Sequence, residues 1–426
     1  MKYRLIFFIF SLFLFIGCDE KDDVARTSVG ISIEYPAGLD ELSVQHETLK
    51  FKNISSGVEI EKSDFKRLSL PEGLYDCSYD ASITYTKNGE TVEGKLRGYR
   101  ASLKVLGPDV NVSLNSYLLE DKDDFIIEEI FFTGTLQPSG KQYYGDQYVK
   151  IYNNTDHVLY ADGVSLMESK FTTVNKYDYS PDIMSQAMTV HAVYTIPGNG
   201  TEYPVQPGES LLICDTGIDH RIANPNSFDL SRSDFEWYDE STVPSQMDID
   251  SPTVPNLDKY YCYTLSFWIL HNRGFRAFAL ARIPEKKEDF LKNYLYTYKY
   301  VMVLPAGTFP MEQTAYKVPN DWIIDAVNAG VQSRYVWNVT DPSLDSGWTH
   351  CGTIDGDKTR YFKSVRRKLL YITRDGRKVL KDTNNSSDDF NTECVPSVIE
   401  EQHTAIDANG ITAINITYDG VTLKTE

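Results

Sequence analysis

Apolar and polar residues alternate along the first quarter of the chain. Residues 29–33, 48–54 and 68–77 carry apolar side chains at every second position over most of their length, and Gly and Pro residues separate the runs. A period of two is typical of strands that bury one face. We therefore expect about seven short strands between residues 28 and 118, which is the pattern of a β-sandwich.

A second pattern begins after the charged stretch at residues 119–124, where we place a linker. Two later segments favour a helix: residues 285–294, which follow Pro284, and residues 320–327, where Asn320 is a candidate N-cap. Between and before them, runs rich in apolar and β-branched residues predict strands at residues 125–133, 147–153, 158–168, 190–196, 210–215, 264–271 and 276–282.

The amino terminus has the pattern of an export signal. A basic start with Lys2 and Arg4 precedes an apolar run at residues 5–16. This run is shorter than the ~20 residues that a membrane-spanning helix needs. We therefore expect residues 1–17 to be a cleaved signal peptide.

The end of that signal resembles a bacterial lipobox, because Gly17 precedes Cys18, although Phe15 departs from the usual Leu or Val. Residues 19–23, Asp-Glu-Lys-Asp-Asp, resemble the acidic export tag of surface lipoproteins of the Bacteroidetes. The resemblance implies that Cys18 is lipidated and that residues 18–27 tether the protein to the outer membrane, facing the cell exterior. An ordinary secretory signal with an incidental cysteine is the alternative.

The amino-acid composition limits the classes of molecule that the protein can bind. The chain of 426 residues has 42 basic and 61 acidic residues, and the formal net charge of -19 argues against a nucleic-acid partner. The 29 Tyr and 20 Phe residues favour strands. Five cysteines besides Cys18 are scattered without a CxxC pair, so we expect neither a zinc knuckle nor a dense disulfide frame. A single disulfide bond between Cys351 and Cys394 is the alternative.

Several blocks resemble known β domains. The stretch "LSLPEGLYDCSYDASITY" at 68–85 is similar to the strand-turn-strand of transthyretin-like or carboxypeptidase-regulatory domains, with a generic immunoglobulin-like sandwich as the alternative. From residue 125 the chain resembles a lamin-tail domain, an immunoglobulin-like sandwich. The blocks that carry this resemblance are "FIIEEIFFTGT" at 125–135, "DQYVKIYNNTDHVLYADGVSLMES" at 146–169, "YTIPGNGTEYPVQPGESLLIC" at 194–214, "LHNRGFRAFALA" at 270–281 and "SVRRKLLYITRDGRKVLKDTNNSSDDF" at 364–390.

We therefore predict a mainly β protein with two β-sandwich domains. The first, immunoglobulin-like or transthyretin-like, covers residues 28–118, and the second, lamin-tail-like with insertions, covers residues 125–395. Residues 396–426 are expected to form C-terminal strands or a tail. The blocks of the second domain, together with "IDHRIANPNSFDLSRSDFEWYD" at 218–239, also resemble an uncharacterised family of Bacteroides surface lipoproteins. That resemblance implies that relatives accompany TonB-dependent outer-membrane receptors.

The sequence holds no recognisable catalytic or nucleotide-binding motif. GxSxG, HExxH, the P-loop and GxGxxG are all missing, and the seven histidines lie far apart in sequence. Carboxylates are so frequent that spacing alone cannot identify a glycosidase pair.

One segment is a candidate cation site. Asp382, Asn384, Asp388 and Asp389 supply oxygen side chains within one short stretch, and Ca²⁺ prefers six to eight oxygen ligands. The segment lacks the Gly and the terminal Glu of an EF-hand loop. Asn and Asp also stabilise tight turns through their own hydrogen bonds, so a structural turn is the alternative.

Aromatic residues form the second candidate site. Tyr294, Tyr296, Tyr298 and Tyr300 recur at a period of two, and Trp268 lies in another aromatic stretch. Exposed rings in a row can stack sugars or other flat ligands. A core face or a protein contact is the alternative, because aromatic residues at this period often pack a sheet.

These observations predict a non-enzymatic, surface-exposed outer-membrane lipoprotein that binds a ligand or partner as an accessory to a TonB-dependent receptor. A structural or adhesive surface protein is the first alternative, and a hydrolase of surface polymers is the second. No cofactor is expected apart from the candidate Ca²⁺.

Overall fold

The computed structural model describes residues 25–36, 39–63, 67–87, 90–119, 123–356 and 358–403. The chain divides into two compact units, Met1–Ser116 and Tyr117–Glu426, which are described separately. The division lies just before the linker expected at residues 119–124. Cys18, the acidic tag and residues 404–426 lie outside the described residues.

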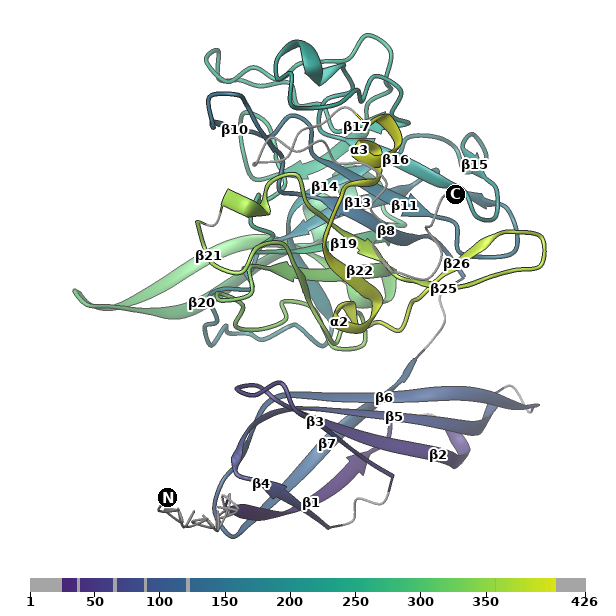
Figure 1. Ribbon diagram of the computed structural model, residues 1–426, viewed down its shortest axis with the longest axis vertical. Coiled ribbons are helices and arrows are strands. Elements are labelled where there is room, and N and C mark those ends of the chain that lie inside the picture. Colours follow the sequence, from purple (N-terminus) through teal and green to yellow (C-terminus); the bar gives the residue numbers. More distant parts are fainter. Residues whose placement is uncertain are drawn as a thin grey trace, which may run out of the picture. The chain divides into compact units, whose positions relative to one another are not determined.

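The first unit has seven strands in the order β3-β2-β5-β6-β7-β1-β4 (Figure 1). They are β1 (Arg26–Glu34), β2 (Asp40–Asn53), β3 (Glu59–Lys62), β4 (Leu68–Pro71), β5 (Gly73–Lys87), β6 (Glu90–Val105) and β7 (Asp109–Leu119). Strands β1 and β7 are parallel, and the other registered pairs are antiparallel. Along β5, Tyr75, Cys77, Tyr79, Ala81 and Ile83 are buried and alternate with more exposed residues. This confirms the period-two prediction of a sandwich strand.

Two large sheets form the second unit. The six-stranded sheet has the order β17 (Phe235–Glu236), β16 (Ser210–Cys214), β11 (Tyr148–Tyr152), β8 (Ile126–Phe131), β24 (Ser364–Arg367) and β27 (Phe390–Cys394). The eight-stranded sheet has the order β20 (Leu295–Leu304), β21 (Gly307–Pro319), β14 (Ala187–Thr195), β13 (Val164–Ser169), β19 (Ala277–Arg282), β22 (Ile323–Gly330) and β23 (Thr349–His350), and β18 (Asp258–Cys262) also pairs with β14.

Smaller elements connect these sheets. The two-stranded pairs are β9 (Thr135–Leu136) with β10 (Gln142–Tyr143), β12 (Leu159–Tyr160) with β15 (Pro204–Val205), and β25 (Leu369–Ile372) with β26 (Lys378–Leu380). The helices are α1 (Lys287–Asn293), α2 (Ser386–Asp389) and α3 (Ser397–Gln402), and the 3-10 turns are η1 (His220–Ile222), η2 (Asn320–Trp322) and η3 (Lys358–Arg360). No helix within the described ranges is long and apolar enough to span a bilayer.

The core of the second unit lies between its two sheets. Ile127 and Ile151 of the six-stranded sheet share one buried cluster with Leu166, Leu280 and Val327 of the eight-stranded sheet. A second cluster covers the opposite face of the eight-stranded sheet. It includes residues from the segments at about 170–190 and 285–360. The eight-stranded sheet is therefore buried on both faces in its centre, as every residue of β13 and β14 shows.

The structure corrects two expected elements. Residues 320–327 were expected to be a helix, but η2 ends at Trp322 and β22 begins at Ile323. Ile323 packs on one face of the sheet and Val327 on the other, so both faces of β22 are buried. A strand that is buried on both faces has apolar residues at consecutive positions, and their spacing can resemble that of a helix. The strand expected at residues 264–271 is irregular chain. Helix α1, in contrast, lies within the expected range of 285–294.

The cysteines of the described chain are free thiols. These are Cys77, Cys214, Cys262, Cys351 and Cys394. Burial raises the pKa of Cys394 to about 12, so this thiol is protonated at neutral pH. The structure therefore has no bridge from Cys351 to Cys394, and these residues fill the core as small apolar side chains.

Candidate binding site

Strands β20 and β21 form a long hairpin that extends away from the rest of its unit (Figure 1). The four tyrosines at a period of two lie on β20 or directly before it, as the sequence predicts. Tyr296 and Tyr298, however, are only 4% and 2% exposed. Their hydroxyls donate hydrogen bonds to Pro181 O and Gln313 Oε1.

The expected ligand-stacking role is therefore corrected for these rings. Tyr296, Tyr298 and Trp268 are buried against protein, and Trp268 stacks on Tyr194 with the ring centroids 4.9 Å apart. Tyr294 is half-buried beside Trp322. The packing alternative applies to Tyr296 and Tyr298 because the segment at residues 171–183 covers their face of β20. It applies to Trp268 because this ring lies in the core between the two sheets.

That covering segment contributes aromatic rings that were not singled out from the sequence. Tyr179 stacks on Phe171 with the centroids 3.8 Å apart, and Tyr177 lies 4.7 Å from Tyr300. Burial raises the pKa of Tyr179 well above its ordinary value, so its hydroxyl remains a hydrogen-bond donor. In the sequence, the spacing of Tyr177 and Tyr179 by two residues is the local feature that could have indicated this contact.

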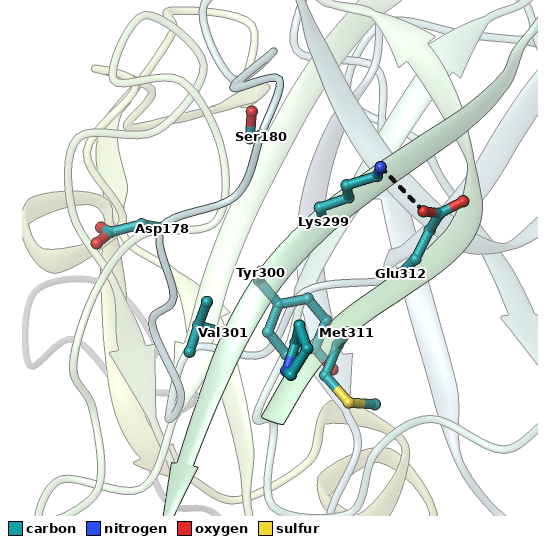
Figure 2. Close-up of a pocket in the computed structure, with 8 residues that line it drawn as sticks. Asp178, Ser180, Lys299, Tyr300, Val301, Met311 and Glu312 are labelled. Atoms are coloured by element: carbon teal, nitrogen blue, oxygen red, sulfur yellow. Dashed lines mark ion pairs between the residues drawn. The ribbon is translucent and has the colours of Figure 1, made fainter. Parts of the chain in front are cut away.

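An open groove with a volume of about 420 Å³ lies where this segment meets the hairpin. Figure 2 shows Asp178 and Ser180 on one wall and the two hairpin strands on the other. The groove is lined by Asp178, Ser180, Lys299, Tyr300, Val301, Pro310, Met311 and Glu312. It combines an exposed ion pair, Lys299 Nζ to Glu312 Oε2 at 3.2 Å, with apolar side chains. Such a mixed surface suits a peptide or another amphipathic partner.

The hairpin continues beyond this ion pair as an uncharged tip. No residue from 300 to 311 carries a charge. Val301 and Val303 are 51% and 72% exposed, and Leu304 and Phe309 are also exposed. Several exposed apolar side chains close together on one hairpin tip are typical of an interaction site.

The candidate cation segment surrounds an arginine. Arg367 is 2% exposed, and its guanidinium donates to Asp325 Oδ2 at 2.6 Å and to Asp382 Oδ1 at 3.0 Å, with Asp389 Oδ2 at 3.7 Å. Burial lowers the pKa of Arg367, but the three carboxylates outweigh burial and raise it. Its positive charge neutralises the carboxylates that the sequence offers as Ca²⁺ ligands.

The remaining predicted ligands of that segment stabilise a turn. Asp389 accepts hydrogen bonds from Thr383 N and Thr383 Oγ1, both at 2.7 Å. Asp388 accepts one from Asn385 Nδ2, and Asn384 has a left-handed backbone with φ of 51°. Within the described part of the chain, no group of three or more His, Cys, Asp or Glu side chains is placed to hold a metal. The structure therefore supports the turn alternative.

One histidine and carboxylate pair has the geometry of a catalytic dyad. His191 Nε2 is hydrogen-bonded to Glu168 Oε2, and Glu168 also accepts from Trp268 Nε1 and His271 N. Burial opposes ionisation of Glu168, but His191 and the other donors hold its pKa at about 2. Both side chains are buried, and Tyr263 stacks on the His191 ring at 4.3 Å. The pair therefore joins β13 to β14 inside the protein and does not face the groove.

Comparisons with known proteins agree with this fold. A family model described as "Protein of unknown function (DUF4876)" matches residues 206–397. A solved DUF4876 family protein from Bacteroides thetaiotaomicron is 22% identical, covers 87% of this chain and 96% of its own, and superimposes with a TM-score of 0.52.

Two other results add no functional information. A solved structure from Bacteroides eggerthii, described provisionally as a cell adhesion protein, is 8% identical over 68% of this chain and 78% of its own, with a TM-score of 0.15. No curated protein matches the chain. Over residues 206–397 the chain is therefore similar to the uncharacterised DUF4876 family, which confirms the expected resemblance to an uncharacterised family of Bacteroides.

Proposed function

We propose that this protein is a surface-exposed outer-membrane lipoprotein that binds a macromolecular partner through the groove beside the β20–β21 hairpin. The partner we propose is a TonB-dependent receptor, to which the protein acts as a non-enzymatic accessory. Cys18 is the proposed lipid anchor, and residues 18–27 are the proposed tether.

The groove and the uncharged hairpin tip together carry this proposal. The hairpin extends from its unit, and its tip places Val301, Val303, Leu304 and Phe309 in solvent. Exposed apolar side chains are stabilised when a partner removes them from water, by roughly 25 cal/mol per Å² of buried apolar surface. The Lys299–Glu312 ion pair at the rim of the groove provides polar contacts that fix the orientation of the partner.

A capture experiment tests the partner. The tagged full chain is used to recover proteins from detergent-solubilised native outer membranes, beside two variants that each introduce one aspartate. Met311→Asp places a charge in the groove, whereas Ile222→Asp places one at a site that is 90% exposed and lies in η1. We expect the parent and Ile222→Asp to recover a TonB-dependent receptor and Met311→Asp to lose it. Equal recovery by all three chains, or no receptor with the parent, would contradict the proposal.

A separate experiment tests the location. Cells that express the parent should incorporate labelled palmitate into this protein, and the Cys18→Ser variant should not. Protease added to intact cells should degrade the parent if it faces the exterior. A parent that stays unlabelled or is protected in intact cells would rule out a surface lipoprotein.

An adhesive or structural role is the second candidate. The first unit favours it, because β5 and β6 have 15 and 16 residues, which are long for strands, and such strands suit a spacer. Loss of surface attachment by cells that lack the protein, with no receptor captured, would support this candidate over the first.

A further inference from the structure

Strand β20 has a free edge at the tip of the hairpin. It is the terminal strand of the eight-stranded sheet, and β21 is its one strand partner among the described residues. Ser180 covers this edge at one point, because Ser180 N donates to Lys299 O and Lys299 N donates to Ser180 O, each at 2.9 Å. Pro305 follows the last residue of the strand. The uncovered stretch is therefore residues 300–304, with Met302 at its centre.

The register shows which main-chain groups face outward. Lys299 directs its N–H and C=O away from β21, towards Ser180. Main-chain direction in an antiparallel strand repeats every second residue, so Val301 and Val303 also direct their N–H and C=O away from β21. Unpaired N–H and C=O groups at an exposed strand edge are a template for another strand.

The other edge of the hairpin is protected against strand addition. Pro310 lies opposite Val301 and Glu312 lies opposite Lys299, so both direct their main-chain groups to the outer side of β21. Pro310 has no N–H, and a charge at Glu312 disfavours edge pairing. Residues 300–304 of β20 contain neither proline nor charge. Only the β20 edge of the tip is therefore able to accept a strand along its length.

We infer that this edge pairs with the same edge of a second copy of the chain. A two-fold axis at Met302 makes the two β20 strands antiparallel and places Val301 opposite Val303 of the second copy, so that these residues exchange hydrogen bonds. Tyr300 then lies opposite Leu304 of the second copy. The pairing uses the whole uncovered stretch and ends at Ser180 on one side and Pro305 on the other.

Charge and side-chain chemistry fit this pairing. Lys299 lies opposite Pro305 of the second copy, so no two like charges face each other, although each chain has a net charge of -19. Val301 and Val303 form cross-strand pairs of β-branched residues, which are favourable in sheets. A lipid bilayer is a poorer occupant, because hydrocarbon leaves the N–H and C=O groups of Val301 and Val303 unpaired.

The interface is small. A stretch of five residues buries less than the ~1,200 Å² that is usual for a stable complex. We therefore expect a reversible dimer whose population rises with protein concentration. The two-fold pairing goes beyond the proposed receptor contact. It uses the main chain of the same tip, and the experiments below test it on the purified protein without a receptor.

Cross-linking tests the register. At the two-fold axis Met302 faces itself in a non-hydrogen-bonded pair, with Cα atoms about 4.5 Å apart, which is within disulfide range. In a Cys18→Ser background of the full chain, Met302→Cys should give a disulfide-linked dimer under mild oxidation. Thr308→Cys on the protected edge is the matched control, and the background chain reports on the native cysteines. Cross-linking of Met302→Cys no faster than of Thr308→Cys would overturn the pairing.

Sedimentation velocity over a range of concentrations tests the edge itself. Val303→Pro removes an outward N–H without removing a hydrogen bond between β20 and β21, and Val303→Thr retains that N–H. Two symmetric hydrogen bonds are lost, so we expect Val303→Pro to raise the dimer dissociation constant roughly tenfold or more, whereas Val303→Thr should stay near the parent. A parent that is monomeric at all concentrations, or that binds phospholipid vesicles through the tip as a monomer, would overturn the inference.

Discussion

At the scale of single residues, Arg367 is the most consequential side chain of the second unit. Its guanidinium contacts three carboxylates, donates to Ile127 O at 2.7 Å and lies over the Phe390 ring at 4.7 Å. Arg367→Met should lower the free energy of unfolding by about 3–5 kcal/mol, because buried carboxylates would lose their counter-charge. Urea unfolding followed by tryptophan fluorescence measures this, since all five Trp residues belong to the second unit.

The matched control is Arg221→Met. Arg221 is exposed and pairs with Asp219 at 2.7 Å, and a solvent-screened surface pair of this kind contributes little to stability. Equal effects of the two substitutions would show that burial does not strengthen the Arg367 network.

Asp146 gives a prediction about pH. It is fully buried, and burial raises its pKa to about 7 against the opposing hydrogen bonds from Ser227 and Thr135. Between about pH 4 and 7 the folded protein therefore holds a proton that an unfolded aspartate, with a pKa of about 3.9, has released. Stability from this group is present at low pH and is lost as the pH rises through that window.

Asp146→Asn removes this titration. The free energy of unfolding of the variant, relative to the parent, should rise by more than about 1 kcal/mol between about pH 5 and 8. Urea unfolding at both pH values measures the difference. A difference that is constant with pH would mean that Asp146 is not protonated in the folded protein.

Side chains at this scale could be predicted only where their partners are close in sequence. The sequence identifies residues 382–389 as a cation site or a tight turn, because Asn and Asp residues close together in sequence are typical of both. Arg367 was not singled out, since its partner Asp325 lies on β22 and nothing local connects the two residues.

At the scale of elements, the turn before β19 depends on one glycine. Gly274 has φ of +61°, and an added Cβ would lie 2.8 Å from the Phe132 ring and 3.1 Å from Ala329 Cβ. Gly274→Ala should therefore lower the free energy of unfolding by about 2–4 kcal/mol, combining backbone strain with overpacking. Gly140→Ala, at φ of +76° with no atom within 4 Å, introduces backbone strain alone. It should lower the free energy of unfolding by about 1 kcal/mol. Similar losses in urea unfolding would show that the Phe132 contact relaxes at little cost.

The period of apolar residues predicted whether most elements are strands or helices, but not which residues cover each face of a strand. Period two at Tyr294–Tyr300 correctly indicated a strand, yet the face on which the rings lie is covered by Phe171 and Tyr179, which are more than a hundred residues earlier. The helix expected at residues 320–327 failed for a related reason, because only the three-dimensional structure shows that both faces of β22 are buried.

At the scale of the whole molecule, composition and alternation were sufficient to predict a mainly β protein with β-sandwiches. The pairing order was not predictable. The antiparallel pairing of β8 with β24, which brings Ile130 beside Val365, joins segments that are separated by most of the second unit. Such long-range pairing is set by packing between sheets and leaves no local signal in the sequence.

The division into two compact units predicts separate unfolding. Phe51 is fully buried in the first unit, 6.4 Å from the Tyr75 ring centroid, and Phe51→Ala should destabilise that unit by about 3–5 kcal/mol. The tryptophan transition should be unchanged, because all Trp residues lie in the second unit. Thermolysin should cleave the first unit of Phe51→Ala faster than the first unit of the parent chain. Phe278→Ala, the matched change in the second-unit core, should instead lower the tryptophan midpoint. A tryptophan midpoint lowered by Phe51→Ala would show that the two units unfold together.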